Sequence, residues 1–231
     1  MPYGWVSSFG PSSSNSKSHD NDTSVRNKVK ETLLLFRDEC GKLLLEEERK
    51  RSKGGGISHR RVHLEAFKIL KDKKVFVKSG KQIIGAVPGV DIGDKFQYRV
   101  ELNIVGLHRP IQGGIDYGNF GGKLLATSIV ASGGYADDVR NKNSLIYTGQ
   151  GGNVMNTKDP EDQKLERGNL ALKNSVQKNP VRVIRGSELM DGSRTYVYDG
   201  LYLKLTCKVK AANSSIRYMI GLGYRGRLVS W

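Results

Sequence analysis

Hydrophobic periodicity changes once along this chain, near Val75, and that change limits the folds the sequence can adopt. Before it, apolar residues recur at steps of three and four, first over residues 25–44 and again over residues 62–70. This spacing is typical of amphipathic helices. After it, short runs alternate between apolar and polar residues and are separated by Pro- and Gly-bearing turns, which is typical of strands. The sequence therefore predicts an α+β fold, with helices first and a sheet after them.

The helical part is expected to occupy residues 24–79 as a hairpin of two helices packed on the sheet. Thr23 or Ser24 should begin the first helix and the glycines 54–56 should end it, while the second is predicted at about residues 61–73. Residues 1–23 are polar without periodicity, so we predict a disordered leader. Two functional alternatives stay open for the hairpin. The first helix could mediate dimerisation, and a basic cluster could bind phosphate or direct nuclear import: Lys50, Arg51, Lys53, Arg60 and Arg61.

The part of the chain after Val75 predicts an antiparallel or mixed sheet with helices to one side. Residues 164–173 favour either a helix or an irregular crossing. The predicted strands are residues 75–77, 96–104, 126–130, 181–184 and 195–198.

The net charge of +15 is unevenly distributed, which weakens its use as a sign of nucleic-acid binding. Residues 25–80 carry 16 basic and 8 acidic side chains, and residues 204–231 carry 6 basic and none acidic. Residues 81–203 are nearly neutral, with 15 basic and 13 acidic side chains. We therefore expect phosphate affinity to come from a few placed Lys and Arg residues and from the basic ends of the chain.

Several classes of protein are disfavoured by the sequence. Cys40 and Cys207 have no metal-ligand spacing, and His59 and His63 lie four apart without further ligands, so no metal or cofactor is predicted. The sequence has no P-loop and no nucleophile constellation, so no catalytic residue is predicted. No apolar run reaches the length of a membrane span, and no signal-peptide block begins the chain. We expect an intracellular protein that does not contact membranes.

The stretch from Ser132 to Asn153 combines two tyrosines and an acidic pair with many glycines. Tyr135 and Tyr147 could sandwich a planar ring, and a carboxylate of Asp137 or Asp138 could accept a hydrogen bond from an exocyclic amine such as that of cytosine. The neighbouring glycines would let the backbone approach the ring edge. The alternative is an ordinary hairpin with core tyrosines and acidic turn residues.

Several short motifs occur in a fixed order over residues 80–203. They are Ser132–Asp138 with Leu145–Asn153, the literal Tyr198-Asp199-Gly200, and the segments Val87–Val90, Gly93-Asp94, Gly106–Pro110, Gly114-Ile115, Asp162–Leu165, Asn169–Leu172 and Pro180–Arg185. Together they resemble the SRA (SET and RING finger associated, or YDG) domain of plant SUVH-type histone H3 lysine 9 methyltransferases.

The resemblance implies a curled, barrel-like sheet flanked by helices and a reader of methylated DNA that flips 5-methylcytosine out of the duplex. The partner would be double-stranded DNA containing 5-methylcytosine, in chromatin in the nucleus, and chromatin- or histone-associated proteins are further possible partners. The residues implied for the pocket are Gly133, Gly134, Tyr135, Asp137, Asp138, Tyr147 and Thr148.

The resemblance also implies a loop that enters the duplex. Gln112 matches the thumb position that fills the gap left by the flipped base, where it could bond the orphaned guanine. His108, Arg109 and Lys158 are candidates for contacts with the DNA backbone, although His108 and Arg109 could instead brace the loop. Residues 153–162 lack the basic finger of the animal members, so several cytosine contexts are expected to be tolerated.

The sequence departs from the family pattern after Leu203. Residues 204–231 are expected to form an atypical basic tail in place of the terminal strands, and the chain to be truncated before the pre-SET and SET domains. The expected function is therefore that of a non-catalytic chromatin-targeting module. The alternative is a truncated scaffold for chromatin proteins that binds DNA only non-specifically.

Overall fold

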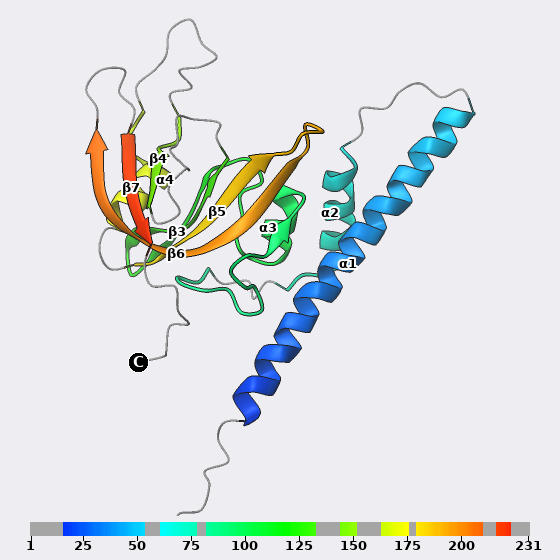
Figure 1. Ribbon diagram of the computed structural model, residues 1–231, viewed down its shortest axis with the longest axis horizontal. Coiled ribbons are helices and arrows are strands. Elements are labelled where there is room, and N and C mark those ends of the chain that lie inside the picture. Colours follow the sequence, from blue (N-terminus) through cyan, green and yellow to red (C-terminus); the bar gives the residue numbers. More distant parts are fainter. Residues whose placement is uncertain are drawn as a thin grey trace, which may run out of the picture.

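The computed structural model describes residues 16–53, 61–77, 82–132, 144–151, 163–175, 179–209 and 216–222 (Figure 1). It confirms an α+β fold with a helical N-terminal region. The elements in chain order are α1 (Ser16–Ser52), α2 (Val62–Asp72), β1 (Lys95–Phe96), α3 (Arg99–Ile104), β2 (Ile115–Phe120), β3 (Lys123–Ala131), β4 (Ser144–Thr148), α4 (Arg167–Asn174), β5 (Val181–Glu188), β6 (Arg194–Val209) and β7 (Ile216–Leu222).

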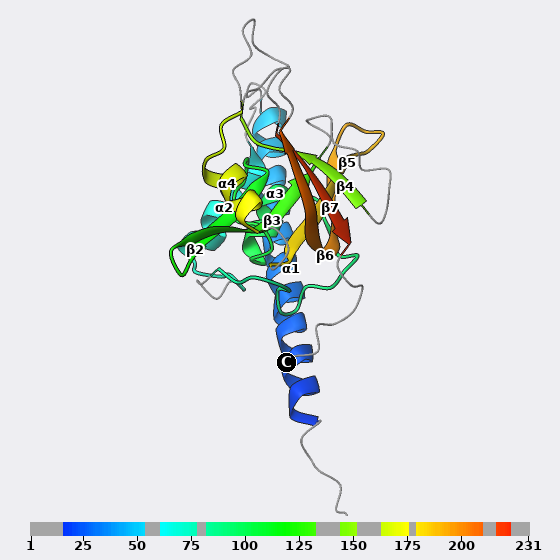
Figure 2. The same cartoon turned by 90° about the vertical axis from the view of Figure 1, so that its left-hand side faces the viewer.

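The strands form one mixed sheet in the order β2-β3-β5-β6-β7-β4, and β1 pairs with β6. Among the described strands, β3 and β5 pair in parallel, and the other neighbouring pairs are antiparallel. The sheet is strongly curved (Figure 2). Within the described residues, β2 and β4 end the order without pairing with each other, but Ile115 of β2 and Tyr147 of β4 share one buried core cluster. The sheet therefore curls around a core without closing into a barrel.

The Tyr198-Asp199-Gly200 motif is the point at which β6 bends. Val183 pairs with Gly200 and Ile184 pairs with Tyr198, so Asp199 is the extra residue of a β-bulge. Gly200 has a φ of 114°, which favours glycine. The Asp199 carboxylate accepts a hydrogen bond from Arg185 Nε at 2.5 Å and another from the Tyr202 hydroxyl. Because a bulge increases local bending and twist, this motif curves the sheet around its core.

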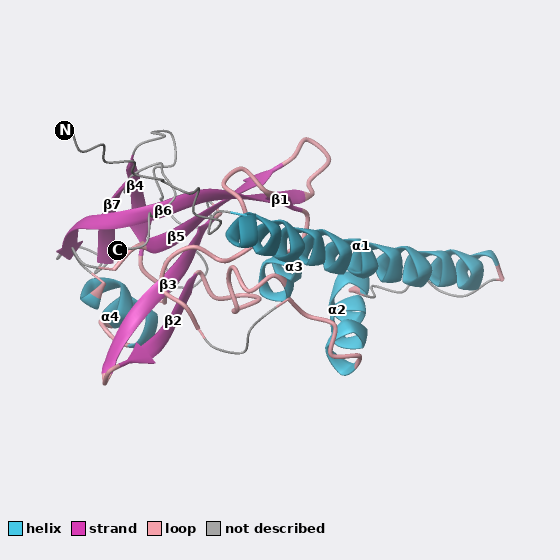
Figure 3. Cartoon of the chain, turned by 90° about the horizontal axis from the view of Figure 1, so that it is seen from below, coloured by secondary structure: helices cyan, strands magenta, loops and turns pink. Residues whose placement is uncertain are grey.

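The helical hairpin packs mainly against α3 and the segment before it (Figure 3). Phe36 and Cys40 of α1 and Ala66 of α2 share a buried cluster with Val100 and Ile104 of α3. Nearer its N-terminus, α1 buries Val29 in a second cluster that includes residues of β1, β5 and β6. The hairpin thus extends the core through α3 and does not lie directly over the open face of the sheet.

Four predictions about secondary structure are wrong. The first helix begins at Ser16 and not at Thr23 or Ser24, so residues 16–23 of the predicted disordered leader are helical, while residues 1–15 lie outside the described residues. Residues 16–23 contain neither Pro nor Gly, and extending an existing helix costs little compared with nucleating one. Residues 75–77 form no strand.

The predicted strand over residues 96–104 is the third error, because only Phe96 is in a strand and residues 99–104 form α3. The alternating Val100, Leu102 and Ile104 are all buried in a helix of less than two turns. Buried Glu101 accepts hydrogen bonds from the N–H groups of Gln97 and Tyr98, at 2.5 and 3.1 Å. These bonds satisfy donors that precede a helix and favour helix over strand at this point.

The expected loss of the terminal strands is also wrong for residues 204–209 and 216–222. The first segment continues β6, and the second forms β7 between β6 and β4. The sequence does carry a strand signal here, since Leu201, Leu203, Leu205, Cys207 and Val209 alternate with other residues. The basic charge of this segment obscured that alternation. Residues 210–215 and 223–231 lie outside the described residues.

Candidate nucleic-acid interface

Five of the predicted site residues are described by the structure, and six are not. Tyr147 and Thr148 lie on β4, and His108, Arg109 and Gln112 lie between α3 and β2. The other six lie outside the described residues: Gly133, Gly134, Tyr135, Asp137, Asp138 and Lys158.

The predicted pocket wall on β4 is almost completely buried. Tyr147 is 4% exposed and Thr148 is 5% exposed. Both pair with β7, Tyr147 opposite Tyr218 and Thr148 opposite Arg217. The strand that carries the two predicted pocket residues is therefore held by a segment that we had expected to be a tail.

Two polar side chains fix the chain directly after β4. Gln163 donates to the carbonyls of Gly149 and Gly151, at 2.7 and 3.0 Å, and accepts from the N–H of Ile216 at 2.8 Å. Asn169 bonds both backbone groups of Gln150, accepting at 2.8 Å and donating at 2.9 Å. A Cβ at Gly149 would lie 2.7 Å from the Asn169 side-chain oxygen. Gln163 and Asn169 belong to the motifs that resemble the family, but the sequence assigned them no role. The structure shows that they fix the backbone at the end of β4.

Gln150 and Gly114 join the pocket strand to the thumb loop, defined as residues 108–114. With its amide oxygen turned toward β2, Gln150 accepts hydrogen bonds from the N–H groups of Gly114, at 2.9 Å, and Ile115. A Cβ at Gly114 would overlap the hydroxyl oxygen of Tyr147. The thumb loop therefore rests directly against the predicted pocket tyrosine.

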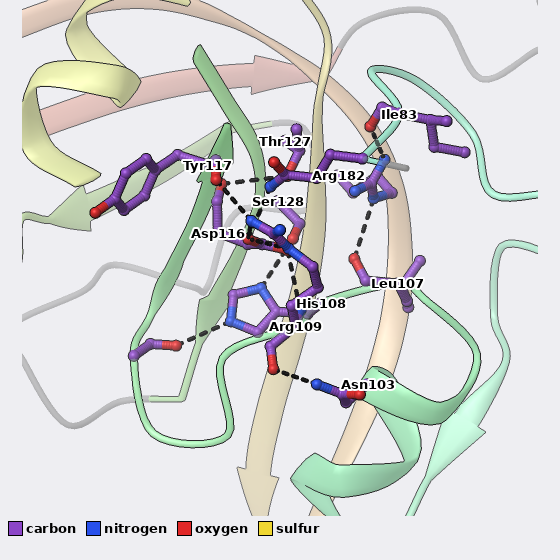
Figure 4. Close-up of polar contacts among 12 residues, drawn as sticks. Ile83, Asn103, Leu107, His108, Arg109, Asp116, Tyr117, Thr127, Ser128 and Arg182 are labelled. Atoms are coloured by element: carbon purple, nitrogen blue, oxygen red, sulfur yellow. Dashed lines mark hydrogen bonds and ion pairs between the residues drawn. The ribbon is translucent and has the colours of Figure 1, made fainter. Parts of the chain in front are cut away.

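Two side chains of α3 also anchor the backbone of the thumb loop. Asn103 donates to the carbonyl of Arg109 at 2.5 Å (Figure 4). Arg99 donates to the carbonyl of Gly113 at 2.5 Å. Gln112 is exposed between these two anchored carbonyls. The structure thus presents the predicted thumb side chain to solvent on a loop whose backbone is fixed on both sides.

His108 braces the loop from inside the protein, and its predicted contact with DNA phosphate is wrong for this structure. Its side chain is 0% exposed. Nδ1 lies 2.8 Å from the Ser128 hydroxyl and Nε2 lies 2.9 Å from the Gly113 carbonyl oxygen (Figure 4). A ring that is buried and bonded at both nitrogens has no group left to contact a phosphate.

Arg109 also braces the loop. Its Nε and Nη2 bond the buried Asp116 carboxylate, with the shortest contact at 2.7 Å, and Nη2 also donates to the Tyr117 carbonyl at 2.7 Å. The backbone N–H of Arg109 donates to the same carboxylate at 3.0 Å. The Arg109 side chain remains 38% exposed. Asp116, which the sequence analysis did not single out, therefore fixes the point at which the thumb loop leaves α3.

The burial of His108 predicts a pH-dependent stability. Burial, together with the charge of Arg99, lowers the pKa of His108 from 6.5 to about 3. The unfolded chain therefore binds a proton near pH 6.5, whereas the folded protein keeps the ring neutral until about pH 3. Because protons bind the unfolded state first, the free energy of unfolding should fall as the pH drops through this window, by about 2 kcal/mol between pH 7 and pH 5.

Urea denaturation at pH 7 and pH 5 measures this effect. His63 contributes in the same direction, because burial also lowers its pKa, so the comparison requires a variant. The His108→Gln protein should be less stable at pH 7 but should lose about 2 kcal/mol less than the unaltered chain on going to pH 5. An equal loss in both proteins would show that His108 can accept its proton in the folded state.

Two broader features bear on the class of site. Among the residues that the structure describes, no group of three His, Cys, Asp or Glu side chains is arranged to hold a metal ion. None of the described helices is both long and apolar enough to cross a membrane.

Comparison with known proteins places these features in a family. The SAD/SRA domain model matches residues 83–220. The chain is 57% identical to the H3 lysine-9 specific histone-lysine N-methyltransferase SUVH5 of Arabidopsis thaliana over 191 residues, which cover 78% of this chain and 24% of SUVH5. It is 46% identical to the YDG domain-containing protein At5g47150 of the same plant, covering 80% of this chain and 57% of that protein.

Solved structures agree with this placement. The SUVH5 SRA domain in complex with hemi-methylated CG DNA matches with a TM-score of 0.55 at 51% identity, over 65% of this chain and all of that one. KRYPTONITE in complex with mCHG DNA and SAH matches with a TM-score of 0.72 at 32% identity, over 89% of this chain and 45% of that one. This chain spans about a quarter of the length of SUVH5 and SUVH6. Since the family model covers more than half of its residues, the chain belongs to the SAD/SRA domain family.

Proposed function

We propose that this chain is a non-catalytic reader of methylated DNA that takes 5-methylcytosine out of the duplex into a pocket beside β4. The observation that supports this most directly is the direct packing of the thumb loop on Tyr147, with Gln112 exposed at its tip. Solved structures of the SUVH5 SRA domain contain hemi-methylated, fully methylated and hydroxymethylated CG DNA. A pocket wall and an inserting loop that rest on each other suit a protein that must extrude a base and fill its place.

In this proposal each predicted site residue has one task. Tyr147 and Tyr135 flank the extruded ring, and a carboxylate of Asp137 or Asp138 accepts a hydrogen bond from the cytosine amine. Thr148 and the backbone at Gly133 and Gly134 line the remaining wall, and Gln112 occupies the gap in the duplex. Lys158 contacts the DNA backbone. The described contacts of His108 and Arg109 make them positioning residues for the thumb loop.

The energetics set the expected selectivity. Burying one methyl group contributes about 0.8 kcal/mol, which corresponds to about a fourfold preference for 5-methylcytosine over cytosine. Thymine also has the methyl group, but it presents a carbonyl to the carboxylate, and an unpaired buried acceptor costs about 1–3 kcal/mol. We therefore expect a modest preference over cytosine and a stronger rejection of thymine.

The relatives also support a location in nuclear chromatin. The curated relatives include H3 lysine-9 specific methyltransferases, of which this chain matches only a part. The proposed role is therefore to direct a silencing activity to methylated DNA in nuclear chromatin.

Fluorescence anisotropy with matched duplexes tests the proposal. Duplexes carrying cytosine, 5-methylcytosine or thymine at one position are titrated with the full chain at two salt concentrations. The unaltered protein should bind the methylated duplex most tightly, and Tyr135→Ala should abolish this preference. Replacing both carboxylates, Asp137→Asn and Asp138→Asn, should mainly weaken the rejection of thymine. Asp72→Asn, an exposed carboxylate on α2, also removes a negative charge and should leave the preference intact. Tyr135→Phe keeps the stacking face and should also retain it.

Equal and strongly salt-dependent binding to all three duplexes would overturn the proposal. That result would favour the alternative of a scaffold that holds DNA non-specifically through its basic residues.

A further inference from the structure

A basic groove lies beside the thumb loop, between the helical hairpin, α3 and the turn that joins β5 to β6. It has a volume of about 880 Å³. Its lining includes Arg37 of α1, Arg61 before α2, Lys95 of β1, Arg194 of β6 and the exposed Gln112 of the thumb loop. In Figure 1 the β5–β6 turn lies above α3 and near the start of α2. The groove thus combines residues from outside and inside the family match, which begins at residue 83.

The groove carries a surplus of positive charge. Its described lining contains five cationic side chains but a single carboxylate, Asp191, whose oxygen already accepts hydrogen bonds from the Ser193 N–H and hydroxyl at 2.9 and 2.6 Å. Arg37 is offset by the buried Glu101, at 3.0 Å. After these two pairings three net positive charges remain, and a groove of this kind attracts anions.

Arg99 and Arg194, which both line the groove, differ in how accessible their guanidinium groups are to a ligand. Arg99 is committed to the thumb loop, where it donates to the Gly113 carbonyl at 2.5 Å, and its guanidinium lies 5.8 Å from the centre of the Tyr196 ring. Arg194 has a side chain that is 53% exposed and lies 4.0 Å from Glu188, at the limit of an ion pair. Arg61 and Lys95 are exposed. Arg61, Lys95 and Arg194 are therefore the cations best placed to meet an anionic partner.

We propose that this groove binds the sugar-phosphate backbone of the DNA beside the extruded base. The inference rests on the proposed function, because it is the thumb residue in the lining that brings DNA to the groove. A duplex carries one phosphate for about every 1.7 Å of its axis, so a duplex entered by Gln112 must place phosphates next to the lining cations. The helical hairpin then adds contacts to those that the SRA domain makes alone.

Removing the three exposed cations tests the inference in the full chain. The triple variant Arg61→Gln, Lys95→Gln and Arg194→Gln should make the plot of log affinity against log salt concentration shallower by about 2–3, since each lost phosphate contact removes about 0.9 from the slope. Affinity at low salt should fall by at least tenfold for methylated and unmethylated duplexes alike. The ratio of the two affinities should not change, because backbone contacts carry no base information.

A second triple variant provides the control. Lys28→Gln, Lys68→Gln and Lys173→Gln remove the same charge from exposed positions outside the groove lining, and should leave the slope within about one unit. The inference would be overturned if the slope falls equally in both triple variants, or in neither. It would also be overturned if the groove variant loses binding to a polyglutamate peptide while its binding to DNA is unchanged. If the unaltered chain shows no methyl preference but the groove variant still lowers the slope, the base-flipping proposal fails while the groove remains a DNA contact.

Discussion

The Arg182→Met variant is expected to unfold with a free energy about 3–5 kcal/mol lower than that of the unaltered chain. Arg182 is 1% exposed. Its Nε donates to the Leu107 carbonyl at 3.1 Å, and Nη1 donates to the carbonyls of Ile83 and Gly85 at 2.9 and 2.7 Å (Figure 4). One side chain on β5 thus ties two distant segments of backbone to the sheet.

Two opposing terms set the size of this effect. Methionine fills much of the same volume but donates nothing, so three carbonyl oxygens lose their donor, at a cost of about 1–3 kcal/mol each. Against this, the substitution removes a buried charge, whose desolvation lowers the pKa of Arg182 to about 10. The loss of the bonds dominates because the carbonyls are fixed in the backbone and cannot turn to other donors.

Urea denaturation of Arg182→Met and of Arg51→Met, an exposed arginine at the end of α1, gives the comparison. The control should change the free energy of unfolding by less than about 0.5 kcal/mol. Leu107 directly precedes the thumb loop, so Arg182→Met should also weaken binding to methylated DNA. A loss of less than 1 kcal/mol would contradict the argument and would mean that water replaces the guanidinium, through the cavity of about 260 Å³ that Arg182 lines.

The Gly114→Ala variant is expected to lose about 1–3 kcal/mol of stability and at least tenfold in affinity for methylated DNA. The added methyl group would overlap the Tyr147 hydroxyl oxygen. Neither side can yield easily, because Tyr147 is 4% exposed and the Gly114 carbonyl accepts from the Val130 N–H at 2.8 Å. Relieving the overlap therefore shifts the thumb loop, the predicted stacking tyrosine, or both.

A rescue variant makes this prediction specific to the contact. Tyr147→Phe removes the overlapping oxygen, and the nearest ring carbon would then be 3.7 Å from the new methyl group. The double variant should recover most of the stability lost by Gly114→Ala. Gly41→Ala is the matched control, because a Cβ at this position in α1 meets nothing within 4 Å. It should raise stability by about 0.5–1 kcal/mol through helix propensity. Absence of rescue in the double variant would show that the overlap does not cause the loss.

The sequence was most informative where a local pattern is sufficient to define an element. The apolar stripes of α1 and α2 indicate helices because their spacing matches the helical repeat. The glycine run that follows α1 marks its end equally well. The order and spacing of short motifs also indicate the SAD/SRA family. Each of these features depends on residues that are close together in the chain, so the sequence alone is sufficient to indicate it.

The errors arose where a pattern supports two structures. Val100, Leu102 and Ile104 alternate like a strand, but the hydrogen bonds of Glu101 with Gln97 and Tyr98 begin a helix there. The residues of β7 lie in a basic segment, and their place as a strand depends on pairing with both β6 and β4. Pairing between segments remote in sequence is decided by tertiary contacts, which no local window contains.

The sequence by itself determined the helical hairpin, the sheet-rich remainder, the family, and the identity of the residues proposed for the base pocket and the thumb. Only the tertiary structure decided which contacts fix the thumb loop and the strand that carries Tyr147. It places His108 inside the protein, gives Arg182 three backbone carbonyls, and rests Gly114 on Tyr147. The physical reason is that a buried polar side chain must find its hydrogen-bond partners wherever the fold brings them. For Arg182 and the segment at Ile83 those partners lie 99 positions apart in the chain.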